Sequence, residues 1–356
     1  MEFFKKDDKN GIIAMRDAQW IALAPFVFQA ARVIRDTGVL KILEDNNDTG
    51  LSVEEVSEKS KYSKYQVQML MESCLASGIL IKNDEKYFVT KVGWFILKDE
   101  MTRINMDFTQ QVCYNGIFDL EKSLENGEPE GLRFLGPWKT IYEGLSVLPG
   151  KALKSWFDFD HFYSDTAFPE ILPLVFANKP ARLLDIGGNT GKWAIQCIEF
   201  DKDVEITLMD LEIQLNEAKK NLDSHPDKDR VKFYQTDLLE NKKFPGGFDA
   251  IWMSQFLDCF SEAQVISILT RCKDALNQEG KVFIVEPMWD QQKFEGGAFS
   301  LMQTSLYFTA IANGNSKFFY SKDLYNYLNK TGFQIIKETR DLGVCQSLIE
   351  CKLATE

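Results

Sequence analysis

The sequence predicts an α/β fold: a doubly wound sheet with an antiparallel last strand, preceded by a mainly helical winged-helix domain. From Arg182 onward, short apolar strands alternate with helical segments, which is typical of a parallel sheet. The final runs "FQIIKET" and "QSLIECKL" are joined only by "RDLGVC", which leaves no room for a crossover helix, so they should pair antiparallel. The 356 residues also exceed what one hydrophobic core usually spans, so we expect more than one domain.

We predict a dimerisation domain at residues 1–105, a helical connector at 106–178 and the sheet domain at 179–356. The helical pattern from Ile12 to about Leu43 has more apolar surface than one packing face requires. Such a helix often completes its burial against a second subunit, so we expect a homodimer formed through the N-terminal domain. The connector is rich in aromatic residues, and we expect some of them to line a substrate pocket.

Two helix-start signatures and a hairpin predict the winged helix. Ser52 with Glu55, and Ser63 with Gln66, fit the capping box, and "GILIKNDEKYFVT" reads as two short strands around a polar turn. Such a unit either binds DNA or serves dimerisation. Residues 1–105 contain 15 Lys and Arg against 16 Asp and Glu, so they lack the basic surface that DNA binding requires.

Composition and charge exclude several classes of function and location. The net charge of −12 argues against non-specific nucleic-acid binding. Seven cysteines without a C-x-x-C pair predict reduced thiols in the cytoplasm, and two histidines make a histidine-based metal site improbable. The start of the chain lacks the order of a signal peptide, and the most apolar run, "WIALAPFVFQAA", is too short to cross a bilayer. We therefore expect a soluble, cytoplasmic protein.

The stretch "ARLLDIGGNTGKWAIQC" places an acid and a glycine loop at the end of the first strand of the sheet. The glycines Gly187, Gly188 and Gly191 do not have the spacing of a dinucleotide fingerprint. The loop also lacks the G-K-[ST] ending of a phosphate-binding loop. Asp185, two residues before the first glycine, would repel phosphate and suit a cationic group such as an amine.

Two further acids end the next two strands. Asp210 in "ITLMD" follows the strand–loop–helix–strand spacing from Asp185, and a carboxylate there can accept hydrogen bonds from a ribose. Asp237 in "YQTDLL" ends the following strand, where it would meet an adenine. A ligand with an ammonium group, a ribose and an adenine, but no phosphate, is S-adenosylmethionine. A strand-end aspartate can also simply cap the next helix, but three at successive strand ends favour cofactor binding.

These residues resemble the motifs of the class I S-adenosylmethionine-dependent methyltransferases, whose Rossmann-like sheet ends with a reversed strand. "MDLEIQL" and "YQTDLL", behind a winged helix, are similar to the plant-type or caffeate-type small-molecule O-methyltransferases, which include bacterial members. The resemblance covers nearly the whole chain. It implies that the three glycines pack on the methionine part, that Asp210 and Leu211 bind the adenosine ribose, and that Asp237 and Leu238 flank the adenine.

The sequence departs from that family where its catalytic base should stand. The family has a histidine in a pattern like "W-x-L-H-D-W-S-D", whereas this chain has "IWMSQFLDCFSEAQ", with Asp258 at the base position and Ser254 at a cofactor-contacting lysine. Glu286 matches the acid that orients the family histidine. A second family glutamate would fall near "NSKFFYS", where the sequence has no acid.

Three residues are therefore candidates for the base: Asp258, Glu286 and His161. An ordinary aspartate, with a pKa of about 4, is poorly matched to a phenol near 10, so burial would have to raise the pKa of Asp258. Asp258 can alternatively cap the following helix. His161 lies in the segment that corresponds to the family's pocket-lining helix, and Tyr163 lies near a family methionine that packs by the reactive methyl group.

The resemblance implies a methyltransferase that acts on a hydroxyl of a small, aromatic or polyketide-like molecule, without a metal ion, nucleic acid or membrane. One alternative is a protein of the same fold that binds the cofactor but has lost methyl transfer or carries another activity. The other is a winged-helix regulator that senses the cofactor, against which the balanced charge of the N-terminal domain argues.

Overall fold

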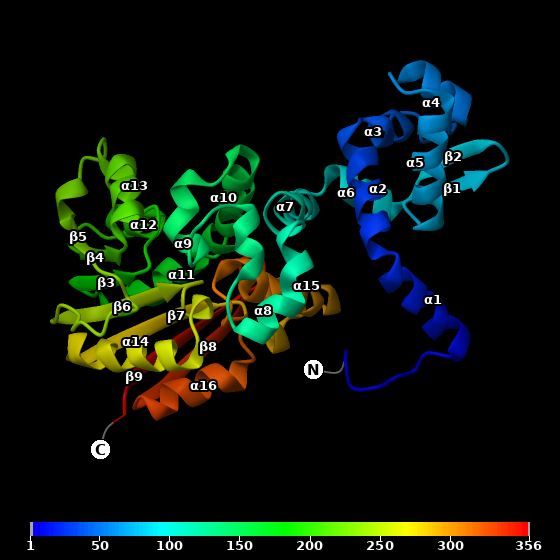
Figure 1. Ribbon diagram of the computed structural model, residues 1–356. Helices are drawn as coiled ribbons and strands as arrows, with labels where there is room; N and C mark the ends of the chain where they lie inside the picture. Colours follow the sequence, from blue (N-terminus) through cyan, green and yellow to red (C-terminus); the bar gives the residue numbers. More distant parts are fainter. Residues whose placement is uncertain (1–2, 355–356) are drawn as a thin grey trace. The chain divides into compact units, whose positions relative to one another are not determined.

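The computed structural model describes residues 3–354, which form two compact units divided between Thr109 and Gln110 (Figure 1). Each unit has its own buried core. The predicted three-part organisation, with boundaries at residues 105 and 178, stays a prediction.

The N-terminal unit combines helices with a two-stranded hairpin. Its elements are α1 (Gly11–Ala22), α2 (Ala24–Asp36), α3 (Val39–Glu44), α4 (Val53–Lys59), α5 (Lys64–Ala76), β1 (Leu80–Asn83), β2 (Lys86–Val89), α6 (Lys91–Lys98) and α7 (Glu100–Phe108). The single helical stretch predicted from Ile12 to Leu43 is broken twice. Pro25 lies in the first turn of α2, and Gly38 takes a left-handed φ of 80° before α3. Both predicted capping boxes are present, at the starts of α4 and α5.

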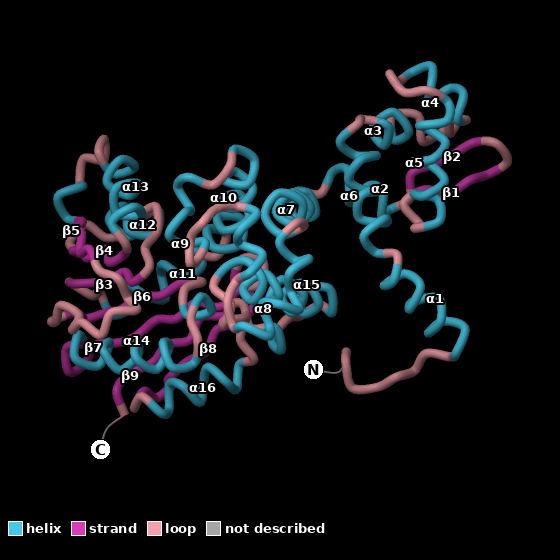
Figure 2. The backbone as a smooth tube through the Cα atoms, viewed as in Figure 1, coloured by secondary structure: helices cyan, strands magenta, loops and turns pink. Residues whose placement is uncertain are grey.

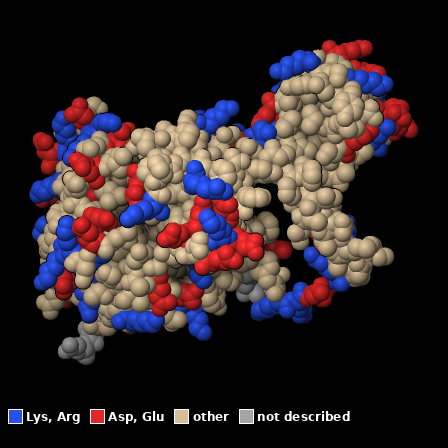
Figure 3. All heavy atoms as spheres, viewed as in Figure 1, with Lys and Arg blue, Asp and Glu red and all other residues tan. Residues whose placement is uncertain are grey.

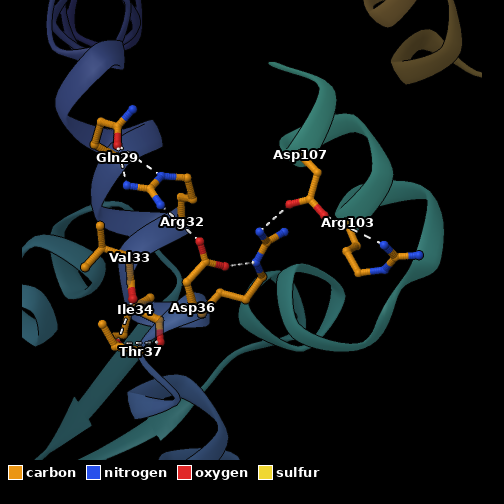
Figure 4. Close-up of polar contacts among 9 residues, drawn as sticks. Gln29, Arg32, Val33, Ile34, Asp36, Thr37, Arg103 and Asp107 are labelled. Atoms are coloured by element: carbon orange, nitrogen blue, oxygen red, sulfur yellow. Dashed lines mark hydrogen bonds and ion pairs between the residues drawn. The ribbon is translucent and has the colours of Figure 1, made fainter. Parts of the chain in front are cut away.

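Charged contacts fix α7 against α2 within this unit (Figure 4). Arg35 donates from Nη2 to Asp107 at 2.6 Å and from Nε to Asp36 at 2.8 Å. Arg103 reaches the second oxygen of Asp107 at 3.7 Å. Because Arg35 is largely buried, these charge-assisted hydrogen bonds compensate for the desolvation of its guanidinium.

The surface of the N-terminal unit includes a row of exposed apolar side chains on its first two helices. They are Ile12, Met15, Trp20, Ile21, Leu23 and Phe26. Figure 3 shows a largely uncharged surface along α1, whereas basic and acidic residues are interspersed elsewhere on the face in view. Within residues 3–354, no single helix is long and apolar enough to span a membrane, and α1 with α2, bent by 66°, meets that length and composition test only as a pair.

The second unit begins with a helical segment of short elements. They are a π-helical turn (Thr109–Cys113), 3₁₀ turns (Gly116–Asp119, Glu130–Phe134, Leu145–Val147, Phe176–Asn178) and the helices α8 (Leu120–Asn126), α9 (Ile141–Gly144), α10 (Gly150–Asp165) and α11 (Phe168–Val175). The longest of them, α10, contributes one wall of the cavity described below.

A seven-stranded mixed sheet follows, in the order β5-β4-β3-β6-β7-β9-β8. The strands are β3 (Arg182–Ile186), β4 (Glu205–Asp210), β5 (Val231–Gln235), β6 (Phe248–Ser254), β7 (Leu276–Glu286), β8 (Phe333–Leu342) and β9 (Gln346–Leu353). The first five strands in that order are parallel, and β9 pairs antiparallel with both β7 and β8, which confirms the predicted reversed ending.

Helices cover both faces of the sheet (Figures 1 and 2). They are α12 (Lys192–Phe200), α13 (Glu212–Leu222), α14 (Glu262–Ala275), α15 (Glu295–Tyr307), which runs into a π-helical turn (Phe308–Ala312), and α16 (Ser321–Lys330). Further 3₁₀ turns lie at Lys228–Arg230, Leu257–Cys259 and Trp289–Gln291. Alternate residues of β3 enter opposite cores: Leu183 packs with α11, α12 and α13, whereas Leu184 and Ile186 pack with α14 and α16. This packing holds the carboxyl ends of the parallel strands at one edge.

Candidate functional site

A cavity of about 390 Å³ opens at the carboxyl ends of the parallel strands, a volume in the range of small-molecule sites. Residues at the ends of β3, β4 and β6 and after β5 form one side, and α9 and α10 form another. The predicted site residues that line it are His161, Asp185, Gly187, Gly188, Asp210, Leu211, Asp237, Leu238 and Ser254. The lining does not include Tyr163, Gly191, Asp258 and Glu286.

The loop after β3 requires glycines, because of its left-handed backbone conformation and because a Cβ would collide with neighbouring side chains. Gly187 has a φ of +74°, and a Cβ there would lie 2.2 Å from the Phe256 ring. A Cβ on Gly188 would lie 2.7 Å from Oδ2 of Asp185. Gly191 has a φ of +78° at the start of α12. The loop therefore leaves the carboxyl of Asp185 uncovered by side chains of the loop itself.

Asp185 carries an unsatisfied buried oxygen. Its side chain is 1% exposed, and within residues 3–354 its Oδ2 has no hydrogen-bond partner. Burial, followed by the nearby Asp210, raises the pKa of Asp185 to about 8. A buried acceptor of this kind favours a ligand that brings a donor or a positive charge. The ammonium group of S-adenosylmethionine fits that requirement.

Asp210 presents a carboxylate that the backbone has already oriented. Its Oδ2 accepts from the Asn189 amide at 2.9 Å, and its Oδ1 accepts from the Leu211 amide at 2.7 Å. Burial raises the pKa of Asp210 to about 6 despite these two hydrogen bonds. Asp237 is exposed after β5 and accepts from the Leu239 amide at 2.8 Å. The strand ends thus offer separate acceptors for separate parts of a nucleoside.

Aromatic residues and unpaired polar atoms form the rest of the cavity. Trp156 donates to the Tyr307 hydroxyl at 2.8 Å, which fixes the indole on this wall. Ser254 Oγ and Gln255 Oε1 are buried without a hydrogen-bond partner in the described part of the chain, and both residues line the cavity. Gln255 also has a left-handed φ of +44°, a strained conformation for this residue type and one that is common at functional sites.

Two buried carboxyl groups lie behind the cavity wall. Glu286 accepts from the amides of Phe256 at 3.1 Å and Leu257 at 2.7 Å, so it holds the turn that follows β6. Burial raises the pKa of Asp258 to about 7, and burial with the charge of Asp258 raises that of Glu286 well above its ordinary value. Cys259, which lines the cavity, has its Sγ 3.4 Å from Asp258 Oδ1. Asp258 is only 2% exposed and does not line the cavity.

His161 faces the cavity from α10, supported by a carboxylate. Its Nδ1 is 3.5 Å from Asp165 Oδ1, one helical turn further on, and its ring stacks on Phe157. Asp165 also holds Lys192, with a 2.6 Å distance between Nζ and Oδ2. A histidine beside a carboxylate is an arrangement that proton-transfer sites use. The carbonyl of Tyr163 accepts from Gln346 at 3.1 Å, so that residue ties α10 to the sheet.

The sequence reasoning missed many polar residues of the cavity, among them Asn189, Lys192 and Asp160. Asn189 and Lys192 belong to "GGNTGK", a stretch that was compared with nucleotide-binding motifs only by its glycine spacing and its G-K ending. Asp160, next to His161, accepts from Asn189 Nδ2 at 3.2 Å. Asn189 and Lys192 could have been predicted from their place in the glycine loop, and Asp160 from its place next to His161.

Comparison with known proteins identifies two domains. A family model for a Dimerisation2-like domain matches residues 15–87, and one for an O-methyltransferase domain matches residues 170–334. The L-tyrosine C(3)-methyltransferase of Streptomyces lavendulae is 22% identical over 323 residues, 90% of this chain and 87% of that protein. The 3-hydroxy-5-methyl-1-naphthoate 3-O-methyltransferase of Streptomyces sahachiroi is 23% identical over 67% of this chain and 68% of that protein.

The fold has solved counterparts. The crystal structure of the S-adenosylmethionine-dependent methyltransferase SibL in its apo form aligns with a TM-score of 0.71 at 20% identity, covering 94% of this chain and 98% of that one. The likeness extends over both units, and at this identity it establishes the fold.

Proposed function

We propose that the protein is an S-adenosylmethionine-dependent O-methyltransferase that methylates a hydroxyl group of a small aromatic or polyketide-like molecule; the matches to a Dimerisation2-like domain and to an O-methyltransferase domain support this proposal. The single observation that carries the proposal is the unsatisfied, buried Oδ2 of Asp185 beside the glycine loop, in a cavity of about 390 Å³. That carboxyl suits the ammonium group of the family's cofactor. The aromatic remainder of the cavity suits a planar acceptor.

Each part of the cofactor has a matching group at the strand ends. Asp185 would hold the ammonium group and Asp210 the ribose hydroxyls, while Asp237 and Leu238 would flank the adenine. Lys192, at the N-terminus of α12, supplies the positive charge that the methionine carboxylate requires. When bound, S-adenosylmethionine supplies a methyl group on a positively charged sulfur: the acceptor's lone pair forms the new bond to carbon, and the carbon–sulfur electron pair stays on sulfur.

We propose His161 as the base that receives the acceptor's proton. It lines the cavity, and Asp165 is placed to orient its ring. Histidine is the side chain that proton-transfer sites use most often. Asp258, although its pKa of about 7 is suitable, does not line the cavity. One oxygen of Glu286 accepts from two backbone amides. We therefore propose that Glu286 and Asp258 support the turn after β6 and do not act as the base.

The second candidate is methyl transfer to a ring carbon. The likeness to L-tyrosine C(3)-methyltransferase, which extends over 90% of this chain, supports it. Removal of a phenolic proton increases the electron density of the ring carbon beside the oxygen, so the same base would serve either outcome. After that carbon takes the methyl group, it loses its own proton to solvent and the aromatic phenol is restored. Identification of the product by mass spectrometry and NMR distinguishes an ether from a ring-methylated phenol.

We propose that the protein works as a homodimer in the cytoplasm, without a metal ion, nucleic acid or membrane as partner. The Dimerisation2-like match at residues 15–87 and the exposed apolar row on α1 and α2 support the dimer. Within the described residues, no cluster of three or more His, Cys, Asp or Glu side chains has the arrangement of a metal site.

A labelled-methyl screen tests the proposal. The protein and S-adenosylmethionine are incubated with phenols, catechols and hydroxylated polycyclic compounds, and label is counted in the organic extract. We expect transfer to at least one class of phenolic acceptor. Cofactor binding without transfer across the screen would favour the alternative of a protein that has lost the reaction. The absence of cofactor binding would contradict the proposal itself.

A further inference from the structure

The cavity is strongly acidic, beyond what one cofactor explains. Six carboxylates and one lysine line it, and no arginine of the described chain does. The carboxylates are Glu143, Asp160, Asp165, Asp185, Asp210 and Asp237. The one lysine, Lys192, is held by Asp165 at 2.6 Å. A negatively charged acceptor would therefore meet repulsion and no free cationic partner.

Most of these carboxylates already have a role. Asp185, Asp210 and Asp237 are assigned to the cofactor, and Asp165 holds Lys192 and lies beside His161. Glu143 is exposed on α9. Asp160 is the remaining carboxylate within the cavity.

Asp160 has no cationic partner of full charge. Its side chain is 24% exposed, and Oδ2 accepts from the neutral amide of Asn189 at 3.2 Å. His161 Nδ1 lies 3.9 Å away, and no lysine or arginine among residues 3–354 lies within ion-pair distance of it. Asp160 also lies one helical turn after Trp156 on α10, and the Trp156 indole donates to the Tyr307 hydroxyl on the aromatic wall. It therefore combines a carboxyl that has no lysine or arginine at ion-pair distance with proximity to the aromatic part of the cavity.

We propose that the acceptor is an aromatic compound that carries a protonated amine, and that Asp160 binds this amine. The inference rests on the proposed function, because it concerns the acceptor of the same methyl transfer. An ammonium group would complete the pairing of Asp160 in a partly desolvated site, where charge pairs are stronger than in water. The indole of Trp156 offers a further favourable surface for a cation. Aromatic carboxylates of the same size should bind more weakly, because the surrounding carboxylates repel them.

Three matched catechols test the charge preference directly. Dopamine, 3,4-dihydroxyphenylethanol and 3,4-dihydroxyphenylacetate share a ring and differ in carrying an ammonium, a hydroxyl or a carboxylate. Each is titrated by calorimetry into the protein saturated with S-adenosylhomocysteine. We expect the amine to bind at least tenfold more tightly than the alcohol, and the acid to bind most weakly. Equal affinities, a reversed order or no binding of the amine would overturn the inference.

Two variants of α10 assign the preference to Asp160. Asp160→Asn should reduce the amine-to-alcohol ratio to less than threefold while the Kd of S-adenosylhomocysteine changes less than threefold. Asp158→Asn removes the same charge from the same helix, at a residue that pairs with Lys154 and does not line the cavity, and should keep the full ratio. If Asp160→Asn instead weakens S-adenosylhomocysteine and keeps the ratio, Asp160 binds the cofactor and the inference is wrong. If the wild-type protein binds no S-adenosylhomocysteine, the proposed function itself fails.

Discussion

At the scale of single residues, Asp185 stands out because its buried carboxyl has an oxygen without a hydrogen-bond partner in the described chain. Such a group destabilises the unliganded fold in its charged form, and is retained where a ligand compensates for it. Asp185→Asn should therefore weaken binding of S-adenosylmethionine at least tenfold. The same substitution should raise the melting temperature of the unliganded protein at pH 9, where the native carboxyl, with a pKa of about 8, is ionised.

Calorimetry and thermal melts with and without the cofactor measure both effects. The excess melting temperature of the variant should shrink as the pH falls from 9 toward 5, because the native carboxyl lowers stability only above its unfolded pKa near 4. This trend serves as the internal control. Unchanged affinity in the variant would show that this carboxyl does not contact the cofactor.

The assignment of the base also belongs to single residues. His161→Gln should lower kcat by about 10²-fold or more and abolish the rise of kcat with pH that a histidine base causes. Asp258→Asn should lower kcat by less than tenfold and keep that pH profile, because its carboxyl does not line the cavity. Steady-state kinetics between pH 5.5 and 9 on an identified acceptor make the comparison. The opposite pattern, with the larger loss in Asp258→Asn, would reassign the base.

At the scale of elements, the proposed homodimer depends on the exposed apolar side chains of the N-terminal helices. Phe26 is 73% exposed on α2, and its neighbours in the exposed row are apolar as well. Phe26→Asp should shift the protein from dimer to monomer, because a desolvated carboxylate in an apolar interface is costly. Light scattering after size exclusion gives the mass of each species. Val92→Asp, at a residue 54% exposed on α6, is the control that should remain dimeric. A wild-type monomer, or a dimeric Phe26→Asp, would contradict the assignment.

The elements of the sheet were predictable because each depends on local pattern. Short apolar runs between helical segments predict parallel strands, and glycines after the first strand predict its turn. The brief link between the last two strands predicts that they run antiparallel. Pro25 and Gly38 indicate the two breaks in the N-terminal helical stretch. The apolar periodicity continues through both residues, so it predicted one uninterrupted helical stretch.

Side-chain direction at the base position was not predictable from spacing. The motif places Asp258 four residues after Ser254, but Gln255 takes a left-handed φ of +44° as the chain leaves β6. Glu286 then accepts from the next two amides and fixes the turn. The motif pointed to this turn, but spacing could not tell which of its side chains would line the cavity. Cys259 lines it, whereas Asp258 is buried and does not.

At the scale of the whole molecule, the buried acids make stability depend on pH. The pKa values of Asp185, Asp210 and Asp258 are raised to about 8, 6 and 7. Between its unfolded pKa near 4 and its folded value, each such group binds more protons in the folded state. Stability therefore falls as pH rises through that window, by up to about 1.4 kcal/mol per pH unit for each group.

The melting temperature of the unliganded protein should accordingly decrease steadily from pH 5 to pH 8.5. S-adenosylhomocysteine should reduce that decrease, because its ammonium group compensates the charge of Asp185. Scanning calorimetry in buffers of constant ionic strength measures both curves. A stability that rises with pH over this range would contradict the raised pKa values.

The cavity as a whole lies beyond what sequence alone predicts. Its strand-end half follows from the alternation of strands and helices, so Asp185, Asp210 and Asp237 could be placed together in advance. Its second half comes from α9 and α10, distant in sequence, whose position depends on packing such as the Trp156–Tyr307 hydrogen bond. The sequence alone could not place Asp160 in the cavity, because its position depends on how α10 packs.

The most direct test of the central claim is a crystal structure of the protein with S-adenosylhomocysteine bound. The account predicts the ribose hydroxyls within ~3 Å of the Asp210 carboxylate and the ammonium group beside Oδ2 of Asp185. A nucleoside bound elsewhere, or one whose ribose and amine leave both carboxyls without contact, would contradict it.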